Sequence, residues 1–178
     1  MRLLPLDDGS VVTWGYDGNG GDSTAVQAQL KQVQQIQASI GSFAAIRDDG
    51  SVVSWGNPTF GSDSRTVQHQ LKNVQQVQAS YGAFAAILGD GSVVSWGDAN
   101  YGGDSREVQH QLKSVQHIQA SNSAFAAILD DGSVVTWGDP KYGGDSGPVQ
   151  NQLKNCRMCS KSRPLLELLP PFSRMELL

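Results

Sequence analysis

The sequence has few cysteines and no long apolar run. Both cysteines, Cys156 and Cys159, lie close to the end of the 178 residues, so no disulfide framework is predicted for the rest of the chain. No apolar stretch approaches the roughly 20 residues that a membrane-spanning helix needs, and the first residues turn acidic too soon for a secretion signal. These absences predict an intracellular protein, cytoplasmic or nuclear, with no membrane partner.

Charged residues are also scarce, at 17% of the chain, and 13 Lys and Arg against 17 Asp and Glu give a net charge of −4. Nucleic-acid-binding domains usually carry a basic patch, so no nucleic acid partner is predicted. The few glutamates and histidines form no carboxylate pair or Ser-His-Asp set at a recognisable spacing. Cys156 and Cys159 supply only half of a structural zinc site. We therefore predict no catalytic residue, no metal site and no cofactor, and a protein that is not an enzyme.

A sequence repeat of 41 residues fills most of the chain. The motif Asp-Gly-Ser-Val-Val-(Thr/Ser)-Trp-Gly begins at four equally spaced aspartates: Asp8, Asp49, Asp90 and Asp131. It contains every tryptophan of the protein: Trp14, Trp55, Trp96 and Trp137. A second motif, Val-Gln-(Gln/His)-(Ile/Val)-Gln-Ala-Ser, recurs at the same spacing. A fixed period of this length indicates stacked supersecondary units that bury a shared core.

Each repeat predicts short antiparallel strands joined by turns. In the second copy, residues 43–46 and 52–55 are rich in apolar and aromatic residues and flank an Asp-Gly turn, which is typical of a hairpin. Residues 33–38 would add another strand, whereas residues 67–72 fit either an outer strand or one helical turn. We expect the alanine pair of each repeat to let adjacent sheets approach closely and the tryptophan to fill the wider gap between them. The glycines of the Asp-Gly turns complete the predicted scaffold: Gly50, Gly91 and Gly132.

This pattern predicts an all-β fold, a β-propeller-type array of about three and a half to four blades of 41 residues, each blade an antiparallel sheet. The repeat domain is expected to span residues 1–154, with units around 1–32, 33–73, 74–114 and 115–154. Residues 155–178 lack the repeat and are rich in leucine, proline and basic side chains. We predict that this tail is disordered or caps the end of the array.

The second copy resembles the repeat of the regulator of chromosome condensation family. The resemblance rests on the Val33 strand, the Phe-Ala-Ala-Ile strand, the segment Asp49-Gly-Ser-Val-Val-Ser-Trp-Gly, and Phe60-Gly61, and it covers about residues 3–154. It implies a seven-bladed propeller that serves as an interaction platform. Members of the family include nucleotide exchange factors for a small nuclear GTPase and large ubiquitin ligases that carry a HECT domain.

The chain departs from the family pattern in three ways. Phe43, Phe84 and Phe125 stand where the family has histidine, the period is shorter, and the copies are too few for a seven-bladed ring. Closure would then need a larger protein of which this chain is a piece, a small four-bladed ring, or two copies that complete one ring. An unclosed array exposes strand edges, so self-association through open blade edges is a further expectation.

Positions that differ among the copies are the candidates for binding, because shared positions build the scaffold. They lie in two sets of loops, which we expect on opposite sides of the array, and the candidate residues are Tyr16, Phe60, Tyr81, Tyr101, Asn122 and Tyr142. The predicted function is a non-catalytic module that binds a protein partner through these loops. Two alternatives stay open: the substrate-binding fragment of a HECT-type ubiquitin ligase, and a guanine nucleotide exchange factor. The family's exchange activity depends on an inserted wedge, for which the uniform period leaves no room.

Overall fold

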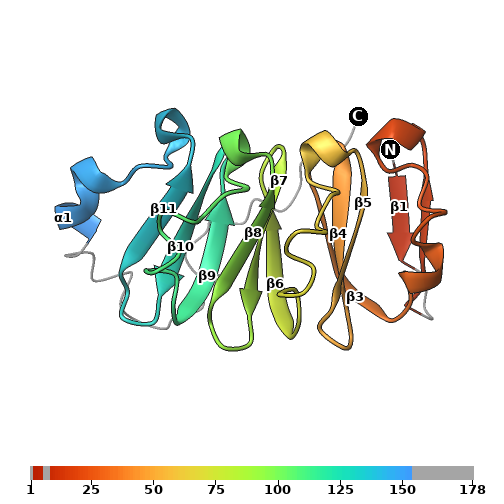
Figure 1. The fold of residues 1–178 in the computed structure, drawn as a ribbon, viewed down its shortest axis with the longest axis horizontal. Coiled ribbons are helices and arrows are strands. Elements are labelled where there is room, and N and C mark those ends of the chain that lie inside the picture. The colour runs from red at the N-terminus through yellow and green to blue at the C-terminus, as the bar shows by residue number, and fades with distance from the viewer. Residues whose placement is uncertain (1, 6–8, 154–178) are drawn as a thin grey trace, which may run out of the picture.

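The computed structural model describes residues 2–5 and 9–153, which form four antiparallel sheets, one for each copy of the repeat (Figure 1). The first sheet pairs β1 (Arg2–Pro5) with β2 (Val11–Trp14). Each of the others is a three-stranded meander, and their strands are β3 (Val33–Ala38), β4 (Ser42–Arg47), β5 (Val52–Gly56), β6 (Val74–Ala79), β7 (Ala83–Leu88), β8 (Val93–Gly97), β9 (Val115–Ala120), β10 (Ala124–Leu129) and β11 (Val134–Gly138). The predicted all-β, propeller-type array of antiparallel sheets is confirmed. The tail predicted at residues 155–178 lies outside the described residues.

Short helical turns link the sheets. They are η1 (Asp17–Asn19), η2 (Gln27–Gln29), η3 (Pro58–Phe60), η4 (Ala99–Tyr101), η5 (Pro140–Tyr142), η6 (Gly147–Val149) and the single α-helical turn α1 (Gln150–Leu153). The ambiguous segment 67–72 is a turn of this kind and not an outer strand, because the amides of Gln70 and Leu71 both bond the Val67 carbonyl. This turn buries Leu71 against the sheet, where the side chain is 1% exposed.

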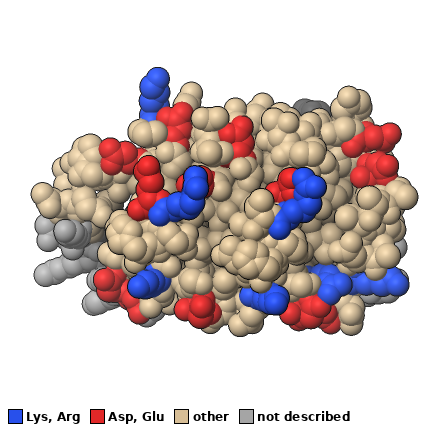
Figure 2. Space-filling view, in the orientation of Figure 1, with Lys and Arg blue, Asp and Glu red and all other residues tan. Residues whose placement is uncertain are grey.

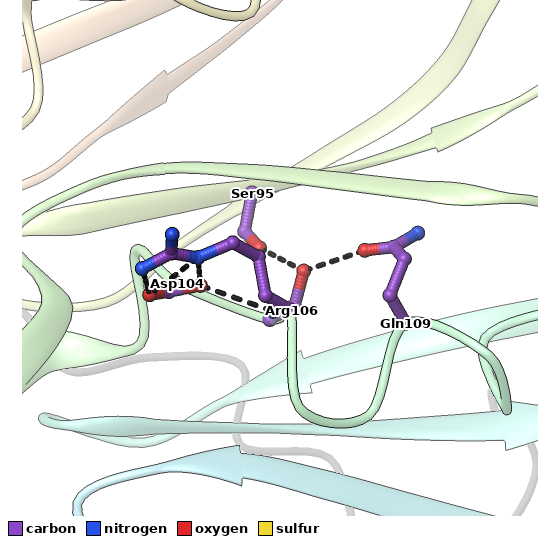
Figure 3. A network of polar contacts seen from close by, with 5 residues as sticks. Ser95, Asp104, Arg106 and Gln109 are labelled. Atoms are coloured by element: carbon purple, nitrogen blue, oxygen red, sulfur yellow. Dashed lines mark hydrogen bonds and ion pairs between the residues drawn. The ribbon is translucent and has the colours of Figure 1, made fainter.

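In every copy a glutamine side chain fastens the turn equivalent to residues 67–72 to the last strand of its sheet, and in the first three copies a serine hydroxyl also donates to this glutamine. In the third copy, the Ser95 hydroxyl bonds the Ser105 hydroxyl at 2.6 Å, and Ser105 donates to Gln109 Oε1 at 2.9 Å (Figure 3). The Gln109 amide then donates to the Val93 carbonyl at 2.8 Å. The same glutamine-to-carbonyl bond occurs in the other copies: Gln27 to Val11, Gln68 to Val52 and Gln150 to Val134.

The hydrophobic core lies between sheets. Side chains that alternate along each strand face either the preceding or the following repeat, as a pleated strand requires. In the second copy Phe43, Val53 and Trp55 pack toward the first repeat, whereas Ile46 and Val52 pack toward the third. Three such clusters occur in the described chain, and each joins two adjacent repeats only. A repeat therefore depends on its neighbours for burial of both faces.

Three of the four predicted scaffold tryptophans tie adjacent sheets together. Each indole donates its Nε1 hydrogen to a glycine carbonyl of the preceding repeat, at N···O distances of 3.2, 3.1 and 3.0 Å: Trp55 to Gly20, Trp96 to Gly61 and Trp137 to Gly102. Each indole also stacks on the phenylalanine of its own sheet: Phe43 at 5.0 Å between ring centroids, and Phe84 and Phe125 at 5.3 Å. Trp14 differs, because it stands in the first sheet and is 45% exposed.

The glycines of the Asp-Gly turns allow the backbone of the next repeat to approach the turn closely. Gly50 has a φ of +72°, and a Cβ there would come within 2.9 Å of the Asn73 backbone. This approach lets the Val74 amide donate to the Gly50 carbonyl at 2.9 Å, which joins two repeats. Gly91 has a similar φ of +77°, and its carbonyl accepts the Val115 amide in the same way. A Cβ on Gly91 would come close to the backbone of Ser114, which is the equivalent of Asn73. Gly132, in the last copy, has a φ of +80°.

The sheets stand side by side in a row. Figure 1 shows β1 near one end of the longest axis, and β11 with α1 near the other. The four-bladed ring that the sequence left open is therefore wrong for the described residues, because the first and last sheets are separated by the two sheets between them. Each described end of the row presents a sheet face with no neighbouring repeat.

Candidate functional site

The two sets of variable loops meet at one edge of the array. A three-stranded antiparallel meander brings its first turn and the end of its third strand to the same side. The turn between β6 and β7 carries Tyr81, and the segment after β8 carries Tyr101, so the two residues lie together. The expectation that these loops lie on opposite sides is wrong for this geometric reason.

Three of the predicted residues form an aromatic cluster on this edge, which we call the aromatic ridge: Phe60, Tyr81 and Tyr101. The rings of Phe60 and Tyr81 meet edge to face, with centroids 5.8 Å apart and planes at 82°. Tyr81 and Tyr101 lie at 5.1 Å and 31°. Tyr81 is 39% exposed, and its two neighbours are half-buried. The ridge thus combines exposed aromatic surface with rings that already support one another.

Capped helical turns fix the two flanking rings. Phe60 and Tyr101 end η3 and η4. The Asn57 side chain at the start of η3 accepts the Thr59 amide at 3.0 Å, and the Asp98 side chain at the start of η4 accepts the Asn100 amide at 2.8 Å. At the other end of η4, the Ser80 hydroxyl donates to the Tyr101 carbonyl at 2.7 Å. An N-cap of this kind satisfies an amide that the turn would otherwise leave unpaired.

Backbone hydrogen bonds hold the middle ring. The Tyr81 amide donates to the carbonyl of Asn122 in the next repeat at 2.9 Å, and the Ile40 amide donates to the Tyr81 carbonyl at 3.1 Å. Ile40, Tyr81 and Asn122 are equivalent positions of successive copies. The Tyr81 loop is therefore bonded on both sides along the array. The adjacent Gly82 lets the Tyr101 ring lie close to this loop, because a Cβ on residue 82 would come within 2.8 Å of that ring.

The remaining predicted residues lie apart from the ridge. Tyr142 is equivalent to Tyr101 and is 58% exposed, but its neighbour along the edge is Asn122, which stands where the third repeat has Tyr81. Tyr16 precedes η1 and is 73% exposed, with its ring folded against Gly18. Its ring makes no aromatic contact with another described residue. The structure thus brings together three of the six candidate residues.

An arginine and an aspartate two residues apart form an ion pair in each of the two loops that follow the ridge. Arg65 binds Asp63 with a shortest N···O distance of 2.6 Å. Arg106 binds Asp104 at the same distance (Figure 3). The Arg65 guanidinium, together with the Arg65 backbone amide, holds the pKa of Asp63 at about 2. Figure 2 shows the basic groups of this face standing singly, mostly beside acidic ones, with broad uncharged areas between them.

The aspartates of the Gly-Asp-Ser segments at residues 21–23 and 144–146 accept backbone amides two residues further on. Asp22 accepts the Thr24 amide at 2.8 Å, and Asp145 accepts the Gly147 amide at 2.8 Å. In residues 2–5 and 9–153 no three His, Cys, Asp or Glu side chains gather in a way that could hold a metal ion. In the same part of the chain no helix has the length and apolar character to cross a membrane.

The residues of the ridge belong to two different positions of the sequence repeat. Phe60 and Tyr101 occupy the same position of successive repeats, and Tyr81 falls halfway between them in the chain. Antiparallel topology alone places these loops at one edge. Contact between the rings could not be derived in this way, because it depends on the spacing between adjacent sheets.

Several solved structures have folds similar to this chain. Human WBSCR16 is 21% identical, with a TM-score of 0.49, and the match covers 76% of this chain and 44% of that one. Yeast RCC1, also called Prp20, is 20% identical, with a TM-score of 0.46, and the match covers 60% of this chain and 30% of that one. Yeast RCC1 belongs to the family whose repeat the sequence resembles. The solved structures with folds similar to this chain therefore include a member of that family.

A third similar structure is the ectodomain of the receptor kinase CR4 from Physcomitrella patens, at 15% identity and a TM-score of 0.48, which covers 75% of this chain and 35% of that one. The chain therefore spans less than half the length of each of these three structures. No family model matches the sequence, and no curated protein matches it either.

Proposed function

We propose that this chain is a non-catalytic protein-binding module whose contact surface is the aromatic ridge. The observation that carries this proposal is the contact of Tyr81 with both Phe60 and Tyr101, which gathers three aromatic rings on one loop-bearing edge. Aromatic residues, tyrosine above all, are enriched among the side chains that supply most of the energy of protein interfaces.

Rigidity of the ridge supports the same role. Binding usually costs about 0.5–1.5 kcal/mol for each flexible side chain that becomes immobilised. The rings of the ridge are already packed together, and their loops are held by caps and by backbone bonds between repeats. Most of the side-chain entropy is therefore already lost on folding, so less is lost on binding and the affinity for a partner is higher.

Variation among the copies supports the location. Positions that build the sheets repeat with little change, whereas the position of Tyr81 holds Ile40 and Asn122 in the neighbouring copies. A surface made from positions that differ between otherwise similar repeats is better suited to one specific partner than to a partner that is itself repetitive.

The ubiquitin-ligase alternative is a special case of this proposal, since the ridge would then bind the substrate while the chemistry resides on another domain. The exchange-factor alternative is less well supported. It needs a projecting insertion, and the three complete sheets follow one another at 41 residues with nothing inserted between them.

The test is selection of binding peptides from a phage-displayed random library on the full chain, followed by measurement of their dissociation constants. We expect binders whose affinity falls by about tenfold or more in Tyr81→Ala, because removal of an interface hot spot costs about 2 kcal/mol or more. Tyr16→Ala is the matched control. It removes a more exposed tyrosine that lies outside the ridge, and it should leave binding unchanged.

Circular dichroism of both variants would establish that the fold is retained. A library that yields no binder, or binders that Tyr81→Ala does not weaken, would overturn the proposal.

A further inference from the structure

One interface recurs three times inside the described chain. At each junction a tryptophan indole reaches a glycine carbonyl of the preceding repeat, and a phenylalanine ring covers that glycine. A Cβ on Gly20, Gly61 or Gly102 would come within 2.9, 2.9 and 2.6 Å of this ring. The glycine thus forms a socket, and the Trp–Phe pair of the next repeat fills it.

The first repeat presents the tryptophan side of this interface without a partner among the described residues. Trp14 is 45% exposed, whereas its equivalents Trp55, Trp96 and Trp137 are 4%, 2% and 4% exposed. Val12 is 44% exposed, and its equivalents are 6%, 7% and 6% exposed: Val53, Val94 and Val135. We call Val12 and Trp14 the N-terminal end face.

The last repeat presents the glycine side of the same interface. Gly143 is equivalent to the three socket glycines and has a similar φ of +98°, but no described atom lies within 4 Å of where its Cβ would stand. Ile128 and Leu153 are half-buried, whereas their equivalents in the preceding repeat, Ile87 and Leu112, are buried. We call Ile128, Gly143 and Leu153 the C-terminal end face.

We propose that a second copy of this chain docks its N-terminal end face on the C-terminal end face, so that Trp14 occupies the Gly143 socket. The two faces are complementary because the interior repeats already join the same two surfaces three times. This inference rests on the fold alone and does not depend on the proposed binding of a partner at the aromatic ridge. The contact is heterologous, since different surfaces meet, and it produces a closed ring or a longer row according to the rotation between copies.

The contact is weaker than an interior junction for two reasons. Among the described residues the first sheet has two strands, with no equivalent of β6, which contributes Val77 at 0% exposure to the interior interface. In addition, Arg2 pairs in register with Trp14 at the position where Phe43 pairs with Trp55. Association is therefore expected to depend on protein concentration.

The experiment measures the mass of the full chain in solution, by light scattering coupled to gel filtration, over a wide range of concentration. We expect the mass to rise above the 19.0 kDa of a single chain. Trp14→Ala should raise the apparent dissociation constant about tenfold or more, as for loss of a buried aromatic anchor. Ile128→Gln should do the same from the opposite face, and Leu153→Gln gives a second variant of that face if Ile128→Gln does not fold.

Mixing tests the head-to-tail arrangement directly. Trp14→Ala keeps an intact C-terminal end face, and Ile128→Gln keeps an intact N-terminal one, so the mixture should recover dimers that neither variant forms alone. Tyr81→Ala is the matched control, since it changes the aromatic ridge and should leave the mass unaltered.

A full chain that stays at 19.0 kDa at every concentration would overturn the proposal, including the case in which residues 154–178 of the same chain cover an end face. Association that survives Trp14→Ala, or variants that fail to complement each other, would overturn it too. Failure of peptide binding at the ridge would leave these results unchanged, so the two proposals fail separately.

Discussion

At the scale of single residues, the exposed aspartates of the hairpin turns accept hydrogen bonds that hold these turns together. Asp49 accepts the Ser51 hydroxyl at 2.6 Å and the Ser51 amide at 2.9 Å, and it also binds Arg47. The Ser51 hydroxyl has the largest influence, and these contacts together hold the pKa of Asp49 at about 2. The pKa values of the equivalent Asp90 and Asp131 are lowered in the same way, by Ser92 and Ser133.

Because the pKa of Asp49 is lowered by folding, we expect the folded protein to lose stability in acid. The pKa of Asp49 is about 2 in the folded chain, against about 3.9 in an unfolded one. Because the folded pKa is the lower one, the stabilisation is complete above about pH 4 and is lost as the pH falls toward 2. The midpoint of thermal unfolding, followed by circular dichroism, should fall across this interval.

Asp49→Asn is the control for this acid dependence, since asparagine still accepts the Ser51 hydrogen bonds but does not titrate. Its unfolding midpoint should vary less between pH 4 and pH 2 than that of the natural chain. An equal dependence in both proteins would show that the Asp49 turn does not contribute.

At the scale of the element, a contact between a glycine of one repeat and the aromatic pair of the next recurs at each junction between sheets. The sequence predicted the strands and the Asp-Gly hairpins well, because β-branched runs and turn residues are local signals. It did not predict which carbonyl receives each indole. Trp96 and Gly61 are 35 residues apart in the chain, and only the packing of sheets brings them together.

Gly102 and Gly143 offer a matched test of this contact. Both have a positive φ, +88° and +98°, so alanine causes backbone strain at either position. At Gly102 the new Cβ would also come within 2.6 Å of the Phe125 ring, whereas at Gly143 no described atom lies within 4 Å. We expect Gly102→Ala to lower the free energy of unfolding by about 1–3 kcal/mol more than Gly143→Ala, which is the usual cost of overpacking.

Chemical denaturation of the two variants would measure this difference. Equal losses of unfolding free energy would mean that the phenylalanine moves aside at little cost, and that the glycine is needed for its backbone conformation alone.

At the scale of the whole molecule, the described chain is a row in which each repeat is stabilised by its neighbours. The three core clusters join the first sheet to the second, the second to the third and the third to the fourth, and none joins the ends. In such an array, stability is close to a sum over repeats and their junctions. The interior sheets have two junctions each, and the end sheets have one.

This arrangement predicts a gradient of local stability along the chain. Amides of β6, β7 and β8 should exchange hydrogen for deuterium more slowly than amides of β2 or β11, because an interior repeat opens only when two junctions break. Native-state exchange monitored by mass spectrometry would measure it. Uniform protection from β2 to β11 would contradict the prediction and indicate a single cooperative unit.

The sequence by itself determined the period, the strands, the turns and the all-β array, because alternating apolar residues and Asp-Gly turns act over a few neighbouring positions. It also singled out Phe60, Tyr81 and Tyr101, but it placed them on opposite sides of the array. Only the tertiary structure decided that these rings touch and that residues 67–72 form a helical turn. It also decided that the described residues form an open row, with Trp14 at one end and Gly143 at the other. These features depend on the distance and orientation between adjacent sheets, which no local pattern of residues specifies.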